Sequence, residues 1–289
     1  MRINLKIRLI LTVLSVLFSQ NVYAGAEHKV SAFLRVKDEI KTIEATLNSI
    51  DGVFDKIVII HSNEKDDGSV ALMNAWCGKR EYCEIHEYPH PVVPSHQYKG
   101  KVPFENQLAS YNNFGLSFFE PEEWVVKIDA DQVYLTDRLK EFVSFLKQNE
   151  NNNKKFGLIG YNTFSFNGQF VKYRRRPMNG VGGDSYVVQR KNINKFVSLG
   201  QFENARFQGI IEKRIWDKPV WFHFMKSIKS GGIVRDKDKI SENEVSFLTK
   251  EEADLFNTHI RPLLQNSPYY NLKLHPDIPQ VAKKEPNSK

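Results

Sequence analysis

The stretch that decides the fold is Trp124–Leu135, which reads WVVKIDADQVYL. Its apolar, β-branched start is typical of a buried strand, and this strand ends in two aspartates one residue apart, Asp129 and Asp131. Ligands of open α/β sheets bind beyond the carboxyl ends of the strands. Two carboxylates at such an end can hold a hard divalent cation, Mn²⁺ or Mg²⁺, which in turn grips a diphosphate. Alone, the same two residues are equally typical of a solvated turn, so the surrounding sequence must decide.

The segments before this stretch alternate between short apolar runs and helical periodicity. Strands are predicted at 29–35, 56–60 and 83–88, and helices at 38–50, 70–76 and 105–119. This alternation predicts an α/β fold with a doubly wound, mostly parallel sheet. Beyond Asp131 the pattern is less regular, with strands expected at 156–170, 186–188 and 221–224 and helices at 139–146 and 251–264.

The composition is that of a globular protein with a basic balance. The chain has 289 residues, 41% of them hydrophobic, and a formal net charge of +7. This charge suits an anionic ligand or an anionic surface, but it does not choose among nucleotide, nucleic acid and membrane. Two cysteines, Cys77 and Cys83, allow one disulfide if the protein is exported; we expect instead a buried thiol at Cys77 and a thiol in a loop.

The N-terminus has the pattern of a secretory signal. Basic residues precede the apolar run Leu9–Phe18, and the segment ends in Val-Tyr-Ala at Ala24. We expect either cleavage after Ala24 or an uncleaved membrane anchor, and we exclude residues 1–24 from the fold. Under the positive-inside rule, an anchor of this kind places the rest of the chain across the membrane from the cytoplasm. A single domain is expected at 25–275, followed by a flexible tail at 276–289.

Four polar motifs are expected to meet at the carboxyl edge of the predicted sheet. They are FLRVKDE at 33–39, DDGS at 66–69, YNN at 111–113 and DAD at 129–131. In this order, and with the runs ENQL and PEEWVVKIDADQVY, they resemble the GT-A fold of nucleotide-diphospho-sugar glycosyltransferases. Within that fold they resemble the bacterial β-1,4-N-acetylgalactosaminyltransferase family of lipooligosaccharide outer-core synthesis. The resemblance covers residues 30–135 well and continues thinly through Gly183-Asp184 and Phe222–Phe224.

This resemblance implies a GT-A domain with a nucleotide-binding half at 29–135 and an acceptor half at 136–275. It implies a metal-dependent inverting transfer of a hexose or N-acetylhexosamine, GalNAc among them, from a UDP-sugar to a glycan acceptor. Lipooligosaccharide or another surface polysaccharide is the expected acceptor. The family suggests the cytoplasmic face of the inner membrane, which conflicts with the signal-like N-terminus. Three alternatives stay open: an uncleaved membrane tether, a true start further along the chain, and a compartment supplied with nucleotide sugar.

Two other hypotheses stay open. One is an exported, non-catalytic protein that binds sugar or nucleotide on the same fold. The other is a metal-dependent hydrolase built on the aspartates, although the sequence lacks the His/Asp clusters that such sites usually carry. Nucleic-acid binding is not expected, because no recognised module surrounds the basic residues.

The resemblance assigns nucleotide binding to residues from each motif. Asp67 is expected to accept a hydrogen bond from the uracil, and Arg35 to lie against the base or reach the diphosphate. Asn112 and the adjacent Asn113 are expected to reach the nucleotide, and Asp129 to contact the ribose. The alternatives are a plain Asp-Gly turn, a surface cation and solvated helix positions.

The metal site is assigned to residues from both halves. Asp131 is expected to be the first ligand, with Asp129 binding directly or through water. Many GT-A enzymes supply a late histidine as a further ligand, and His223 is the matching residue here. A lone histidine in an aromatic run is otherwise a core residue. Lys127, within the strand, is expected to pair with an aspartate.

The chemistry of inversion requires a general base that deprotonates the acceptor hydroxyl. Asp184, which follows the glycine pair Gly182-Gly183, is the expected base, with Glu203 and Glu212 as alternatives. The basic run at 172–176, with Arg174 and Arg175, is expected to bind an anionic acceptor or lipid headgroups, or else to form a solvated face.

Overall fold

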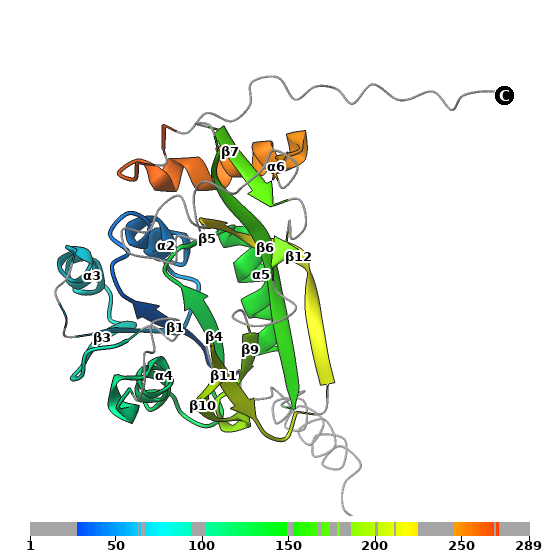
Figure 1. Cartoon of the computed structure of the whole chain (residues 1–289). Coiled ribbons are helices and arrows are strands. Elements are labelled where there is room, and N and C mark those ends of the chain that lie inside the picture. Colours follow the sequence, from blue (N-terminus) through cyan, green and yellow to red (C-terminus); the bar gives the residue numbers. More distant parts are fainter. Residues whose placement is uncertain are drawn as a thin grey trace, which may run out of the picture.

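The computed structural model of the chain describes residues 28–62, 64, 67–93, 102–148, 153–166, 169–173, 178–179, 186–199, 202–210, 212–224, 245–268 and 270–271. These residues form an α/β fold around one large, curled sheet (Figure 1). The strand order along the sheet is β13-β7-β6-β9-β4-β1-β2-β3, and β5, β8 and β12 pair to its side. The predicted signal or anchor segment at 1–24 and the predicted tail at 276–289 lie outside the described residues.

The first half of the chain forms the parallel part of the sheet, as predicted. Its strands are β1 (Val30–Val36), β2 (Lys56–Ser62), β3 (Cys83–Tyr88) and β4 (Trp124–Asp129). They pair in parallel in the order β3-β2-β1-β4, so all four carboxyl ends lie at one edge. The register places Arg35 of β1 beside Asp129 of β4.

Helices cover both faces of this parallel sheet. They are α2 (Ile43–Ser49), α3 (Ser69–Cys77), α4 (Leu108–Leu116) and α5 (Thr136–Lys147). The strand alternation turns Leu34 and Ile128 towards the core shared with α2, α3 and α5, and turns Phe33 towards the core shared with α4. The predicted helix at 38–50 begins only at Ile43, because Asp38 has a left-handed φ of 55° that a right-handed helix excludes.

The second half adds strands that are mostly antiparallel to their neighbours. They are β5 (Gln132–Tyr134), β6 (Lys154–Phe166), β7 (Gln169–Tyr173), β8 (Met178–Asn179), β9 (Tyr186–Gln189), β12 (Glu212–Phe224) and β13 (Val245–Phe247). The strand expected at 156–170 is therefore two strands of a hairpin, β6 and β7. β12 runs parallel to β6 along much of its length, and starts well before the predicted 221–224.

Two features of the second half were not predicted from the sequence. β10 (Ile193–Leu199) and β11 (Phe202–Phe207) form a separate hairpin, which lies with α4 at the lower end of the view in Figure 1. The helix expected at 251–264 is a short α6 (Lys250–Leu255) followed by a π-helical turn at Phe256–Ile260 and a 3₁₀ turn at Arg261–Leu264.

The two cysteines correct an expectation from the sequence. Cys77, at the end of α3, and Cys83, at the start of β3, form a disulfide with a Cα–Cα distance of 5.2 Å, so neither is a free thiol. The turn between α3 and β3 returns the chain to the sheet and brings the two residues together. In the part of the chain that the structure describes, no helix is long and apolar enough to cross a membrane.

Candidate functional site

The Asp-x-Asp motif lies in a turn that two other segments hold in place. β4 ends at Asp129, and β5 begins at Gln132. Thr46 of α2 donates a 2.9 Å hydrogen bond to the carbonyl of Ala130, and the amide of Phe224 donates one of 2.9 Å to the carbonyl of Asp131. Both carboxylates therefore stand on a fixed backbone at the carboxyl edge of the parallel strands.

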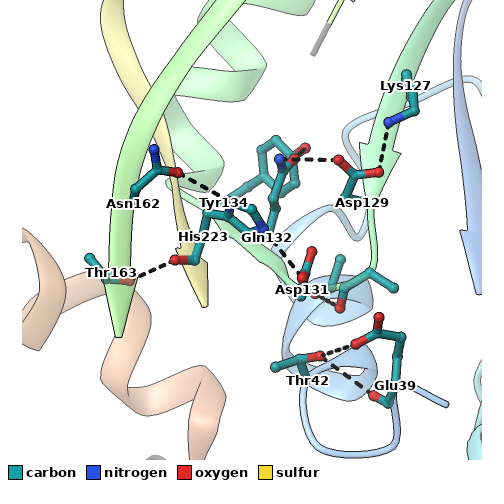
Figure 2. A network of polar contacts seen from close by, with 12 residues as sticks. Glu39, Thr42, Lys127, Asp129, Asp131, Gln132, Tyr134, Asn162, Thr163 and His223 are labelled. Atoms are coloured by element: carbon teal, nitrogen blue, oxygen red, sulfur yellow. Dashed lines mark hydrogen bonds and ion pairs between the residues drawn. The ribbon is translucent and has the colours of Figure 1, made fainter. Parts of the chain in front are cut away.

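The carboxylate of Asp129 is held by its neighbours (Figure 2). Lys127 Nζ donates to Oδ1 at 2.7 Å, and Gln132 Nε2 donates to Oδ2 at 3.4 Å. Burial raises the pKa of Asp129, but the charges of Lys127 and Arg35 outweigh it and hold this pKa below its usual range. Asp129 is thus an ionised group that the protein itself neutralises.

The hydroxyl of Tyr134 completes this chain of contacts. It donates to Gln132 Oε1 at 2.7 Å. Burial, and then the charges of Asp129 and Asp131, raise the pKa of Tyr134 well above its usual range, so the hydroxyl is neutral and acts as a donor. The bond turns the amide nitrogen of Gln132 towards Asp129.

Asp131 faces a histidine from the other half of the domain. Its side chain is buried, and His223 Nε2 lies 3.3 Å from Oδ2 (Figure 2). The other ring nitrogen, Nδ1, lies 3.2 Å from Oδ1 of Asn162 on the neighbouring strand β6. The structure therefore brings together two predicted metal ligands that are far apart in the sequence.

The donor set of Asp131 and His223 fits a divalent cation. A carboxylate oxygen and an imidazole nitrogen are ligands of Mn²⁺, and ions of this class keep positions for substrate phosphates and water. Among the described residues, no three His, Cys, Asp or Glu side chains are grouped for metal binding. Asp131 and His223 would be two protein ligands of such an ion, whereas the carboxylate of Asp129 is already in contact with Lys127 and Gln132.

Arg35 lies at the same edge, next to Asp129 in the register of β1 and β4. Its guanidinium pairs with Glu203 of β11 at 2.5 Å, and both side chains are less than one-fifth exposed. Arg35, a predicted nucleotide-binding residue, and Glu203, an alternative general base, therefore contact each other. The carboxylate of Glu203 is thus already in contact with a cation and is less available to an acceptor hydroxyl.

Asp67 and Asn113 have structural partners. Asp67 accepts hydrogen bonds from the amides of Ile40 and Ser69 at 3.0 and 3.1 Å, which fixes the turn before α3. Asn113 binds the backbone of Phe196 in β10 with both ends of its amide, at 2.7 and 3.0 Å. These contacts tie α2 to α3 and α4 to the β10–β11 hairpin.

Asn112 differs from the sequence-based expectation. It is fully buried inside the domain, whereas a contact with the nucleotide requires an accessible side chain. Neither atom of its amide has a hydrogen-bond partner among the described residues. The helical pattern could not show this, because the β10–β11 hairpin, which packs against α4, comes from a distant part of the sequence.

Glu212, the second alternative base, lies far from the motif. It begins β12 and pairs with Lys154 and Arg214, whereas His223 is near the end of that strand. At about 3.3 Å per residue the two are roughly 35 Å apart along the strand. Glu212 is therefore excluded as a base at this edge. Asp184, Arg174 and Arg175 lie outside the described residues, as does Asp66.

Three residues in contact with the predicted site were not assigned to it from the sequence. Gln132 and Tyr134 follow the motif, and Asn162 comes from β6. The strand alternation after Asp131 carries a signal for Gln132 and Tyr134, which share one side of β5. No local signal marks Asn162.

Comparisons with known proteins were made for the whole chain. A family model described as "Beta-1,4-N-acetylgalactosaminyltransferase (CgtA)" matches residues 25–241. No curated protein matches the sequence. A crystal structure of S. aureus TarS 1-349 in complex with UDP matches at 12% identity and a TM-score of 0.43, covering 68% of this chain and 61% of that one.

A crystal structure of GalNAc-T7 with UDP, GalNAc and Mn²⁺ matches at 8% identity and a TM-score of 0.41. It covers 67% of this chain and 45% of that one. The chain therefore spans less than two thirds of the length of both solved structures.

Proposed function

The chain belongs to the β-1,4-N-acetylgalactosaminyltransferase (CgtA) family, and from this premise we propose that it is a metal-dependent inverting glycosyltransferase of the GT-A type. Its donor is a UDP-linked hexose or N-acetylhexosamine, with GalNAc among the candidates. Its acceptor is a glycan such as lipooligosaccharide or another surface polysaccharide. The observation that carries the proposal is the pair formed by Asp131 and His223, 3.3 Å apart at the carboxyl edge of the parallel strands.

The residues at this edge have complementary roles towards the donor. Asp131 and His223 would hold Mn²⁺ or Mg²⁺, which when bound neutralises the charge that develops on the departing UDP. Arg35, beside Asp129 in the strand register, would supply a positive charge for the diphosphate. Asp129, neutralised by Lys127, is left to accept a hydrogen bond from the ribose.

The acceptor side is proposed to supply the base. Asp184 deprotonates the acceptor hydroxyl as that oxygen attacks the anomeric carbon and UDP departs on the opposite face. Glu203 is less suited to this role because its carboxylate is already paired with Arg35. Arg174 and Arg175 would bind anionic groups of the acceptor. Asp67 remains the proposed partner of the uracil. Its carboxylate accepts from the amides of Ile40 and Ser69 and from the hydroxyl of Ser69, which leaves a lone pair for one more donor.

The test is an assay of UDP release with a panel of UDP-sugars and glycan acceptors, with and without Mn²⁺. The variant Asp131→Asn removes the proposed metal ligand, and Asp137→Asn, an exposed aspartate at the start of α5, is the matched control. We expect Mn²⁺-dependent turnover that Asp131→Asn lowers by more than tenfold, and that Asp137→Asn leaves unchanged.

Each part of the proposal can fail separately. Turnover that persists in the presence of a chelator would refute the metal dependence but would support the assignment as a glycosyltransferase. Binding of UDP without turnover of any donor would favour the non-catalytic binding protein. Hydrolysis of a substrate that carries no nucleotide would favour the hydrolase.

A further inference from the structure

Both ring nitrogens of His223 are in contact with an oxygen atom. Nε2 lies 3.3 Å from the carboxylate of Asp131, and Nδ1 lies 3.2 Å from the side-chain oxygen of Asn162. Asn162 is 4% exposed, and it is the register partner of His223 across the parallel strands β6 and β12. Figure 2 shows the imidazole between these two side chains.

The contact with Asn162 points to one tautomer of the neutral ring. An amide oxygen is an acceptor only, so the Nδ1 that faces Asn162 carries a hydrogen. The protonated ring would also donate from Nε2 to Asp131, whereas a neutral imidazole has one hydrogen, which leaves a lone pair on Nε2. Two groups with lone pairs, Nε2 and the Asp131 carboxylate, then face the same space. This arrangement suits a cation between them, whereas the opposite tautomer would join His223 and Asp131 by a hydrogen bond.

The surrounding strands fix the ring in this position. Phe222 and Phe224, on either side of His223, are fully buried. Thr163 donates a 2.9 Å hydrogen bond to the carbonyl of His223, next to the pairing with Asn162. The backbone contacts thus place the imidazole, and the contact with Asn162 sets which nitrogen is protonated.

We propose that Asn162 is a positioning residue that holds His223 in the Nδ1–H tautomer and so presents the Nε2 lone pair, with Asp131, to a divalent cation. The role of the cation rests on the proposed function, but the tautomer does not. Groups that orient a metal-bound histidine in this way typically change metal affinity by 10–100-fold when they are removed. Asn162 touches neither substrate nor the cation and acts through His223.

The first measurement is the tautomer of His223 in the metal-free protein. Nitrogen-15 NMR of the histidine rings at alkaline pH distinguishes a protonated Nδ1 from a protonated Nε2, and comparison with His223→Gln identifies the signal. We expect the Nδ1–H form in the wild type. Asn162→Leu, which has no acceptor, should lose this preference, and Asn162→Asp, which keeps one, should retain it.

The second measurement is Mn²⁺ affinity by electron paramagnetic resonance. We expect Asn162→Leu to weaken Mn²⁺ binding at least tenfold and Asn162→Asp to stay within about threefold of the wild type. Thr163→Val is the matched control. It removes the hydrogen bond to the backbone of the same histidine but leaves Asn162, and it should also bind within about threefold.

The possible failures are distinguishable. A wild-type His223 with its hydrogen on Nε2 would overturn the inference, and this result does not depend on whether Asn162→Leu folds. Equal Mn²⁺ affinity of Asn162→Leu and the wild type would also overturn it. Absence of Mn²⁺ binding by the wild type, with the Nδ1–H form present, would instead refute the metal dependence of the proposed function, while supporting the effect of Asn162 on the ring.

Discussion

Arg35 and Glu203 are 168 residues apart in the sequence, yet Nη1 of the arginine lies 2.5 Å from Oε1 of the glutamate. The contact joins the end of β1 to the β10–β11 hairpin, directly beside Asp129. Glu203 therefore helps to hold the guanidinium in place.

If Arg35 binds the diphosphate, removing Glu203 should weaken donor binding rather than stop the chemical step. We expect Glu203→Ala to raise the Kd for UDP about tenfold, because a hydrogen bond to a charged group contributes about 1.5 kcal/mol or more. Glu203→Gln keeps an acceptor for Arg35 and should have a smaller effect. Calorimetry measures the Kd for UDP, and steady-state kinetics measures kcat. A large fall in kcat with an unchanged Kd would instead identify Glu203 as the base.

The buried pair of Lys127 and Asp129 should contribute strongly to stability. Lys127→Met leaves a carboxylate without its cation, and we expect the free energy of unfolding to fall by about 3 kcal/mol at neutral pH. The double variant Lys127→Met/Asp129→Asn should recover part of this loss, since it removes the unpaired charge as well. Urea denaturation of Lys127→Met, Asp129→Asn and the double variant measures the coupling energy between the two residues. Fully additive losses of stability would contradict this coupling.

The same pair predicts a pH dependence. The folded-state pKa of Asp129 is below the ordinary value of 3.8, so the unfolded chain takes up the proton first as the pH falls. The stabilisation is therefore complete above the ordinary pKa and is lost as the pH falls through the lower, folded-state pKa. The stability difference between the wild type and Lys127→Met should be largest at neutral pH and should narrow below about pH 4. A difference that is constant with pH would contradict this.

His223 should be required for cation binding in a way that an exposed histidine is not. We expect His223→Gln to weaken Mn²⁺ binding by more than tenfold, because it removes one of two protein ligands. His259, exposed on the π-helical turn, provides the matched variant His259→Gln, which should bind like the wild type. Titration followed by electron paramagnetic resonance compares them, and equal affinities would show that His223 is a core residue.

Gly160 should be required for the packing of β6 on β12. A Cβ atom at this position would lie 2.1 Å from Nε1 of the fully buried Trp221. We expect Gly160→Ala to cost about 1–3 kcal/mol or more, seen as a lower Tm. Trp221→Phe makes room for the methyl group, so the double variant should be more stable than the sum of the two losses predicts. If the losses of stability in the two single variants simply added in the double variant, the result would contradict a close contact between Gly160 and Trp221.

The disulfide between Cys77 and Cys83 makes the cellular location of the protein testable, because disulfides persist in oxidising compartments. Its sequence separation is six residues, so closing the loop contributes roughly 2 kcal/mol in the chain-entropy model. We expect reduction to lower the Tm by about 5 °C. Peptide mapping after alkylation tests the bond in protein taken from cells. Two alkylated thiols would indicate a reducing compartment and a cytoplasmic domain, against the signal-like N-terminus.

The sequence by itself determined the parallel half of the domain. Apolar runs and helical periodicity are local properties of the chain, and they were sufficient to predict β1 to β4 and the position of the Asp-x-Asp motif at their carboxyl edge. The resemblance to a glycosyltransferase family rested on the same motifs, and the family match confirms it.

Only the tertiary structure decided which of these side chains are available. Two neighbouring aspartates look alike in the sequence, but Asp129 is neutralised by Lys127 whereas Asp131 faces His223. Asn112 looked accessible on a helix and is buried. Contacts such as these depend on how the β10–β11 hairpin and β12 return to the parallel sheet. Strand register and long-range packing leave no periodic signal in a single sequence, so only the fold shows which aspartate Lys127 contacts and that Asn162 lies beside His223.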